Sequence, residues 1–196
     1  MSILWWEKTV EYYFIQKYVD LRTFVAPLDG NHEKAGDAIF ANVSKWVLIE
    51  FKRDSKSVSD ELKKFTDYKK AKEELESIGQ HHLIIYGEEN FLGKDIELVC
   101  QEYFSGKKVD TELALESGIS KSKFIEYINK FVEHKKNSKS GSGSFGLVAG
   151  VSKTGAVTRC MRLNEFGKAI KLEKKLQIKL DQELQNQQQT QAPRMR

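Results

Sequence analysis

The run KWVLIEFKR, residues 45–53, constrains the fold more than any other part of the chain. It is rich in β-branched and aromatic residues, which favours a β-strand. Because side chains alternate across a strand, the run has two faces, Val47, Ile49 and Phe51 on one and Trp46, Leu48, Glu50 and Lys52 on the other. The first face is expected to enter a core. The second face carries a carboxylate and an ammonium group close together, and this pair requires an explanation.

Helical and strand patterns surround this run in an order that predicts a mixed α/β fold. The predicted helices cover residues 4–21, 60–79, 120–136 and 164–184, and the predicted strands cover residues 37–41, 45–53, 81–87 and 95–104, with a further hairpin over residues 146–163. A turn at residues 42–44 would join the first two strands as a hairpin, and the next helix would cross to the following strand. This order predicts a mixed β-sheet flanked by helices, with a C-terminal hairpin and a long helix.

Composition divides the chain into four predicted parts. Residues 1–134 would form the α/β domain, and the Lys-, Gly- and Ser-rich residues 135–145 would form a linker. Residues 146–186 would form an appended hairpin and helix, and the Gln-rich residues 187–196 would be disordered. Leucines four residues apart in the appended helix fit packing against the same chain and pairing with a second protomer equally well. A homodimer or a larger complex through this helix therefore remains open.

The overall composition is that of a soluble protein with a weak attraction to polyanions. The chain has 196 residues, 40% hydrophobic residues and a formal net charge of +4, which is compatible with a nucleic-acid partner. Its two cysteines lack metal-type spacing to a third ligand and are expected to be reduced thiols. No run approaches the roughly 20 apolar residues of a membrane-spanning helix, and a signal-peptide pattern is missing. We therefore expect a cytoplasmic protein with no membrane partner.

Three side chains form the strongest candidate for a functional site. If residues 37–41 and 45–53 pair as a hairpin, Asp37 lies near Glu50 and Lys52 at its open end. Mg²⁺ prefers oxygen ligands, so Asp37 and Glu50 could hold this ion, with Mn²⁺ as a substitute. The ion would polarise a phosphoryl oxygen and activate a water, while Lys52 could orient that water or offset developing charge. The cluster therefore suits metal-assisted hydrolysis of phosphodiester bonds.

The same residues resemble a known family. Asp37, followed after twelve residues by Glu50, Phe51 and Lys52, resembles the signature of the PD-(D/E)xK nuclease superfamily, which includes restriction enzymes and Holliday-junction resolvases. The resemblance covers roughly residues 5–87. It implies a restriction-endonuclease-like fold and Mg²⁺-dependent nuclease activity. It also implies that Asp37 and Glu50 are metal ligands, that the carbonyl of Phe51 is another, and that Lys52 is the catalytic lysine.

Many members of that superfamily add a glutamate from the first helix to the site. Here Glu7 begins a stretch that resembles the family's first-helix pattern, which implies that Glu7 is a further catalytic residue. Glu11 lies one turn later and is the alternative. At about 100° per residue, Glu7 lies closer to the apolar stripe of the helix than Glu11 does, so Glu7 is favoured.

Basic residues are frequent just after the catalytic candidates. Eight of them lie in residues 52–72, counting Lys52 and Lys72 themselves. The candidates for nucleic-acid binding are Lys56, Lys63, Lys64 and Lys69. Contacts between such residues and phosphates would make the affinity depend on salt. The alternative is a solvated helix face, on which these charges are balanced by neighbouring acids such as Asp60 and Glu61.

These observations predict a Mg²⁺-dependent endonuclease that acts on DNA more readily than on RNA. From the habits of the family, DNA processing or anti-phage defence is the expected setting. Two alternatives stay open. The chain could be a non-catalytic nuclease-fold subunit that binds nucleic acid or a partner in a larger complex, or an interaction module whose charged strand face is structural.

Overall fold

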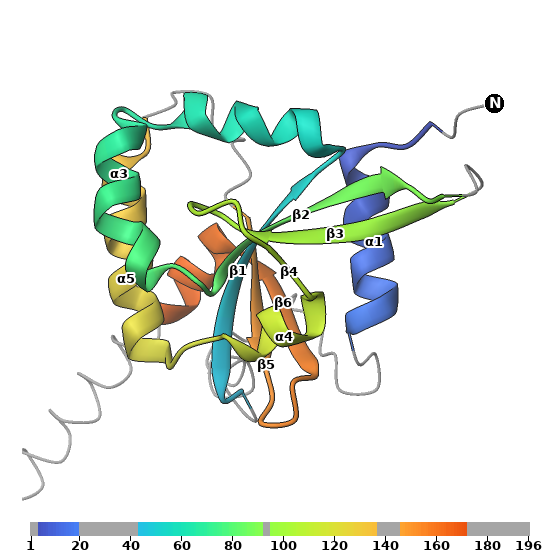
Figure 1. Cartoon of the computed structure of the whole chain (residues 1–196). Helices are drawn as coiled ribbons and strands as arrows, with labels where there is room; N and C mark the ends of the chain where they lie inside the picture. Colours follow the sequence, from blue (N-terminus) through green and yellow to red (C-terminus); the bar gives the residue numbers. More distant parts are fainter. Residues whose placement is uncertain (1–3, 20–42, 92–94, 137–145, 172–196) are drawn as a thin grey trace, which may run out of the picture.

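The computed structural model describes residues 4–19, 43–91, 95–136 and 146–171 (Figure 1). In chain order its elements are α1 (Glu7–Tyr18), β1 (Lys45–Lys52), η1 (Ser55–Lys64), α3 (Tyr68–Leu75), η2 (Glu76–Ile78), β2 (His82–Glu89), β3 (Ile96–Glu102), β4 (Lys108–Val109), α4 (Thr111–Glu116), α5 (Lys121–His134), β5 (Leu147–Val151) and β6 (Val157–Arg162). Residues 163–171 are also helical. The predicted mixed α/β class, with helices beside a mixed sheet, is confirmed.

One mixed sheet joins the described strands. Their order across the sheet is β4-β3-β2-β1-β5-β6. β1 and β2 are parallel, and each of the other neighbouring pairs is antiparallel. The crossover from β1 to β2 runs through η1 and α3, as the sequence predicts. A helical crossover between parallel strands places the helices over one face of the sheet, and this arrangement positions the candidate site.

The hairpin predicted between residues 37–41 and 45–53 is wrong, because the hydrogen-bonding sides of β1 are already occupied. On one side, Lys45–Ile49 pair with β5, more than ninety residues later in the chain. On the other side, Leu48–Lys52 pair with β2, and Trp46 forms a bridge with Ile119. Residues 37–41 themselves lie outside the described residues.

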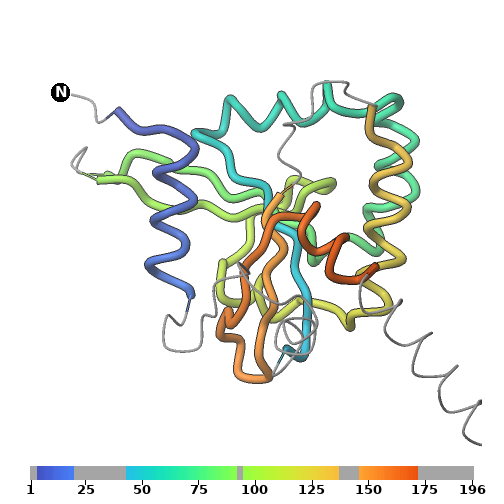
Figure 2. The backbone as a smooth tube through the Cα atoms, turned by 180° about the vertical axis from the view of Figure 1, so that it is seen from behind, coloured from blue at the N-terminus to red at the C-terminus, as the bar shows by residue number. Residues whose placement is uncertain are grey.

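The two faces of β1 pack against different helices, as its alternation predicts. Val47 and Ile49 pack with Val10 and Phe14 of α1, and these four side chains are fully buried. The opposite face packs against apolar residues of α3, α5 and residues 163–171, which include Leu75, Phe124, Phe131 and Phe166. Figures 1 and 2 show α1 on one side of the sheet and α3 and α5 on the other. Each fully buried Val or Phe contributes about 1.5–3 kcal/mol, so both layers are held firmly.

The single helix predicted over residues 60–79 is divided into η1 and α3. Between them the chain straightens at Phe65, which is buried and forms a bridge with Lys135 just after α5. The amide of Thr66 also donates a hydrogen bond to the carbonyl of His134 at 3.0 Å. Pairing with this distant segment overrides the local helical pattern. It also fixes the end of η1, which carries Glu61.

The predicted C-terminal hairpin is present as β5 and β6, but it is not an appendage. β5 pairs directly with β1 and extends the same sheet. Leu147 and Ala149 enter the core under α1, while Val148 enters the core under α3 and α5. The division at residues 135–145 is therefore wrong as a domain boundary, because the segments on both sides share their cores. The predicted long helix is described only over residues 163–171, and the remainder lies outside the described residues.

The two cysteines and the helices bear on the expected surroundings of the protein. Cys100 and Cys160 are buried free thiols, and burial raises the pKa of each to about 12. A protonated thiol is a poor nucleophile and a poor metal ligand, so neither cysteine is a candidate for chemistry. Within the described ranges, every helix is too short or too polar to cross a bilayer.

Candidate active site

Glu50 and Lys52 lie next to each other on one face of β1, near its carboxyl end. Both are buried, with 4% and 6% of their surface exposed. They share this face with Trp46 and Leu48, as the alternation predicts. Because β1 and β2 are parallel, the carboxyl ends of both strands meet at this edge, where open α/β sheets commonly place ligands.

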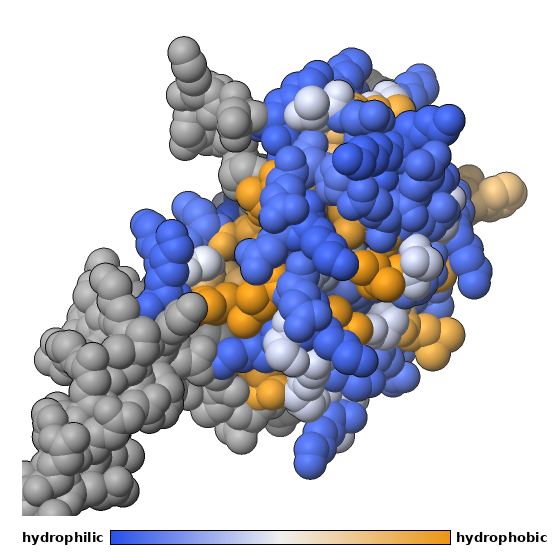
Figure 3. Space-filling model, turned by 90° about the vertical axis from the view of Figure 1, so that its left-hand side faces the viewer, coloured by the Kyte–Doolittle hydropathy of each residue, from blue (hydrophilic) through white to orange (hydrophobic). Residues whose placement is uncertain are grey.

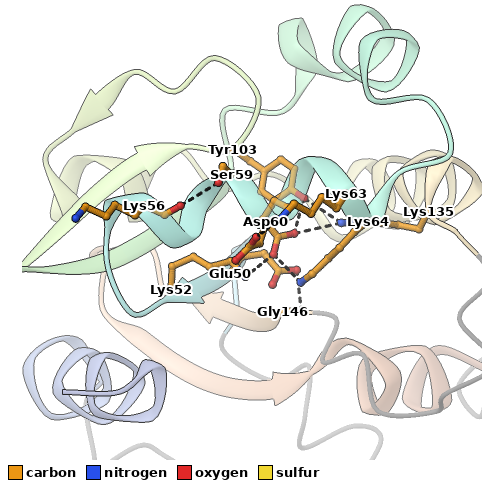
Figure 4. Close-up of polar contacts among 11 residues, drawn as sticks. Glu50, Lys52, Lys56, Ser59, Asp60, Lys63, Lys64, Tyr103, Lys135 and Gly146 are labelled. Atoms are coloured by element: carbon orange, nitrogen blue, oxygen red, sulfur yellow. Dashed lines mark hydrogen bonds and ion pairs between the residues drawn. The ribbon is translucent and has the colours of Figure 1, made fainter. Parts of the chain in front are cut away.

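Glu61 of η1 is the centre of the charged cluster. Its Oε1 forms ion pairs with Lys52 at 2.5 Å and Lys64 at 2.6 Å. Its Oε2 accepts a hydrogen bond from the hydroxyl of Tyr103 at 2.7 Å and lies 3.4 Å from Nζ of Lys135. Figure 4 shows Lys52, Lys64, Lys135 and Tyr103 converging from different elements. One buried carboxylate therefore has four donors around it.

The local structure of η1 explains why Glu61 points inward. In a 3₁₀-helix, side chains three residues apart lie on the same side. Val58 is partly buried against the core, Glu61 follows three residues later, and Lys64 three residues after that. The helix begins after Asp54, whose carboxylate accepts a hydrogen bond from the amide of Ser57 at 2.9 Å. This cap fixes the helix start, and the side that carries Val58 fixes its rotation.

Lys135 approaches Glu61 from the end of α5. Its Nζ lies 4.1 Å from the ring centre of Phe65 and 4.5 Å from that of Phe131, and it donates a hydrogen bond to the Tyr103 hydroxyl at 2.9 Å. Ring faces attract a cation, and they do so more strongly where water is excluded. Burial lowers the pKa of Lys135 to about 8, against the opposing effect of Glu61. The ammonium is thus held in an aromatic cage.

Glu50 has a different environment from Glu61. Its Oε1 accepts a hydrogen bond from the amide of Gly146 at 3.1 Å. Burial, followed by the charge of Glu61, raises the pKa of Glu50 to about 7. Burial would also raise the pKa of Glu61, but Lys135, Lys64 and Lys52 outweigh it and hold that pKa well below its usual range. Two carboxylates with pKa values pushed apart are typical of sites that perform chemistry.

The metal ligands predicted from the sequence are only partly placed. Glu50 lies in the cluster, and Phe51 lies beside it in β1 with its side chain on the opposite face, against α1. Asp37 lies outside the described residues, so its position beside Glu50 stays a prediction. Within the described residues, no group of three or more His, Cys, Asp or Glu side chains is arranged to hold a metal ion.

The two candidate glutamates of α1 are placed opposite to expectation. Glu11 is buried, and Arg162 of β6 donates hydrogen bonds to its two carboxylate oxygens at 2.8 and 3.1 Å. Glu7 is exposed in the first turn of the helix. The argument that Glu7 lies closer to the buried side is therefore wrong. The angle to the apolar stripe favoured Glu7, but Glu11 is the residue that lies on the buried side, where Arg162 is its partner.

Glu7 nevertheless lies electrostatically close to the cluster. Burial opposes a rise in the pKa of Lys64, but Glu50, Glu61 and, to a smaller degree, Glu7 raise it. Glu11 serves a different purpose, because its ion pair with Arg162 ties α1 to β6. Of the two, Glu7 remains the candidate for the site, and its catalytic role stays a prediction.

The lysines predicted to contact nucleic acid have different surroundings. Lys64 belongs to the cluster, whereas Lys56 and Lys69 are exposed and Lys63 pairs with Asp60 at 2.7 Å. Figure 3 shows the side of the molecule formed by α3 and α5, on which hydrophilic residues cover most of the surface and apolar residues show between them. This is typical of a solvated face, so phosphate contacts by Lys56, Lys63 and Lys69 stay predictions.

Four residues of the cluster were not identified from the sequence. The sequence pattern places Glu61 among the acids that balance nearby lysines, and it places Lys135 and Gly146 in the linker or at its edge. The same pattern places Tyr103 in a strand. A signal was available only for Glu61, since it lies three residues before Lys64 and three after Val58 on a capped helix.

Comparisons with protein-family models, with curated proteins and with solved structures found no match for this chain.

Proposed function

We propose that this chain is a Mg²⁺-dependent endonuclease of restriction-endonuclease-like fold that hydrolyses phosphodiester bonds, in DNA more readily than in RNA. The main support is the placement of Glu50 and Lys52, buried next to each other at the carboxyl end of the central parallel strands. A second carboxylate, Glu61, lies within ion-pair distance of Lys52. The resemblance of Asp37, Glu50 and Lys52 to the nuclease signature supports the same reaction and favours a role in DNA processing or anti-phage defence.

The carboxylate of Glu50, together with the predicted ligand Asp37, would offer the oxygen atoms that a hard divalent cation prefers. Burial and Glu61 oppose the ionisation of Glu50, so a cation beside it would favour its charged form. Asp37 and the carbonyl of Phe51 would complete the ligands, as the resemblance implies, and Mn²⁺ would substitute for Mg²⁺. When bound, the ion would polarise a phosphoryl oxygen and lower the pKa of a bound water.

The lysines of the cluster would act on the phosphate. Lys52 would stabilise the negative charge that develops during hydrolysis, and its burial strengthens this effect, because water screens a buried charge less. Lys64 reaches Glu61 from the surface with 41% of its side chain exposed, so it would contact the phosphate backbone of the substrate. Glu7 would stand at the same edge.

Cleavage of supercoiled plasmid with Mg²⁺ tests the proposal. The wild-type chain should nick or linearise the plasmid, and Glu50→Gln and Lys52→Met should each lower the rate by about 100-fold or more. Glu88→Gln is the control, since Glu88 is a partly exposed acid of β2 that pairs with Lys108. Unfolding curves establish that each variant is folded, and RNA tested in parallel examines the choice of nucleic acid. Cleavage that persists in both site variants would overturn the proposal.

A second function is favoured by one observation. Lys52 and Glu61 neutralise each other inside the protein, with 8% and 2% of their side chains exposed. Such a pair would serve equally well in a non-catalytic nuclease-fold subunit that binds nucleic acid or a partner in a larger complex. Fluorescence anisotropy with a labelled duplex distinguishes the two functions. Salt-dependent binding without any cleavage would support the non-catalytic subunit.

A further inference from the structure

We propose that Glu61 is the positioning residue that holds the ammonium group of Lys52 in place for phosphodiester hydrolysis. This inference rests on the proposed function and deepens it. The geometry points to Glu61 because its Oε1 lies 2.5 Å from Nζ of Lys52, while 8% of the Lys52 side chain is exposed. In the described part of the chain, Glu61 is the acid that forms an ion pair with Lys52.

A catalytic lysine on a strand needs an acidic partner if its ammonium group is to stay in one position relative to the reacting phosphate. Lysine has a flexible four-carbon stem and an ammonium group with no fixed fork geometry. An orienting carboxylate restricts the ammonium to one position, and a displacement of about 1 Å at a reacting group is enough to lower a rate by about 100-fold. Glu61 comes from η1, outside the strand that carries Lys52, so it fixes Nζ independently of the backbone of β1.

Glu61 is itself fixed from the side that faces away from Lys52. Its Oε2 accepts a hydrogen bond from the Tyr103 hydroxyl at 2.7 Å, and Lys135 donates to the same hydroxyl at 2.9 Å. Lys135 is in turn held between the rings of Phe65 and Phe131. Tyr103 follows β3 and Lys135 follows α5, so two further segments determine the orientation of the carboxylate. Ordered supporting contacts of this kind are what a precise site requires.

The charges of the cluster suit the same role. Three ammonium groups, those of Lys52, Lys64 and Lys135, surround one carboxylate, so Glu61 offsets part of their charge without cancelling it. Without the negative charge of Glu61, the buried ammonium groups of Lys52 and Lys135 would repel each other and the partly exposed Lys64. With it, positive charge remains for a phosphodiester anion beside Glu50. Glu61 is therefore placed to orient Lys52 and to permit a lysine-rich site to form.

The test compares Glu61→Gln with Glu61→Asp in the full-length chain. Gln keeps the shape of the side chain and removes its charge, while Asp keeps the charge on a shorter stem. Glu61→Gln should lower kcat for plasmid cleavage by about 10- to 100-fold with KM changed less than about threefold. Glu61→Asp should recover part of this loss. The control is Glu88→Gln, which removes the acid that pairs with Lys108 and leaves Lys52 untouched, and it should cleave like the wild-type chain at equal folded fraction.

A second measurement does not depend on cleavage. In ¹⁵N NMR spectra, the ammonium protons of Lys52 should exchange slowly with solvent in the wild-type chain and quickly in Glu61→Gln. The backbone amide signals should show that the variant is still folded. If Glu50→Gln and Lys52→Met abolish cleavage but Glu61→Gln cleaves at the wild-type rate, the positioning role is wrong and the nuclease stands. If the wild-type chain does not cleave, the proposed function fails, and with it the role of Glu61 in hydrolysis, whatever the NMR spectra show about the ion pair.

Discussion

At the scale of single residues, Gly146 links the fold to the candidate site. Its amide donates the hydrogen bond to Glu50, and it immediately precedes β5. A Cβ atom at this position would lie 2.6 Å from the backbone oxygen of Ile49 and 3.1 Å from Cδ1 of Leu48. Any larger residue must therefore push the start of β5 away from β1, and the hydrogen bond to Glu50 would be lost with it.

We expect Gly146→Ala to lower the free energy of unfolding by roughly 1–3 kcal/mol, the usual cost of overpacking a rigid site. Gly167→Ala is the matched control, because a Cβ atom at Gly167 would meet nothing within 4 Å and the position is helical. That control should be neutral or more stable by up to about 1 kcal/mol. Urea unfolding of both variants checks the prediction, and equal stabilities for the two would show that β5 tolerates a side chain next to Ile49.

Two buried histidines make the fold sensitive to acid. The surface of His81 is 1% exposed and that of His82 is fully buried, and Nε2 of each lacks a hydrogen-bond partner within the described residues. Burial lowers the pKa of His81 to about 4 and that of His82 well below its usual value. In the unfolded chain the His81 imidazole binds its proton near pH 6.5, whereas in the folded chain it does not until about pH 4. The stability that His81 contributes is therefore full above pH 6.5 and is lost as the pH drops towards 4.

His81→Phe removes one of these groups while keeping an aromatic ring between Phe124 and Tyr127, where the imidazole makes edge contacts. Between pH 7 and pH 5 the wild-type chain should lose about 2 kcal/mol more stability than this variant, because only the wild-type unfolded state gains the extra proton. Urea unfolding at the two pH values measures the difference. Parallel pH profiles for the two proteins would mean that His81 also binds its proton in the folded state.

At the scale of elements, the sequence predicts what local patterns determine. The alternation in residues 45–53 correctly assigned the two faces of β1, and the apolar run at residues 81–87 correctly gave its parallel neighbour. Pairings between distant segments were missed. β5 takes the position beside β1 that was expected for residues 37–41, and the segment after α5 interrupts the helix expected over residues 60–79. Neither pairing can be predicted from the local sequence of β1 or of residues 60–79, because the order of the strands depends on the whole sheet.

The candidate site follows the same rule. Glu50 and Lys52 could be predicted because they lie two residues apart on one strand, so the period of the strand alone brings them together. Glu61 and Lys135 reach them from two other elements and are separated by 74 residues. Their convergence depends on the break at Phe65, which turns η1 toward the sheet and brings in the end of α5. Sequence spacing alone could not reveal that break.

At the scale of the whole molecule, the described strands form one continuous sheet. β5 lies between β1 and β6, and its side chains enter both cores of the sheet. Phe166, from residues 163–171, packs against Trp46 with ring centres 5.0 Å apart. Without these segments β1 would be an edge strand with unpaired backbone groups over Lys45–Ile49, and Trp46 would lose its contact with Phe166, which favours aggregation over folding. The predicted division into a nuclease-like domain and an appendage would instead require residues 1–134 to fold without residues 146–186.

A chain shortened to residues 1–136 should therefore lack a cooperative unfolding transition and a dispersed NMR spectrum. The matched control is a chain that ends at residue 186, which lacks only the Gln-rich stretch and should unfold at the wild-type midpoint. Loss of β5 removes the strand pairing over Lys45–Ile49 as well as apolar burial. Because a small single domain folds and unfolds in one transition, the remaining elements should then not fold on their own. Circular dichroism during thermal unfolding measures both chains. A sharp transition in residues 1–136 would show that the first 136 residues hold a complete core, and the sheet would then be two folding units joined at β1 and β5.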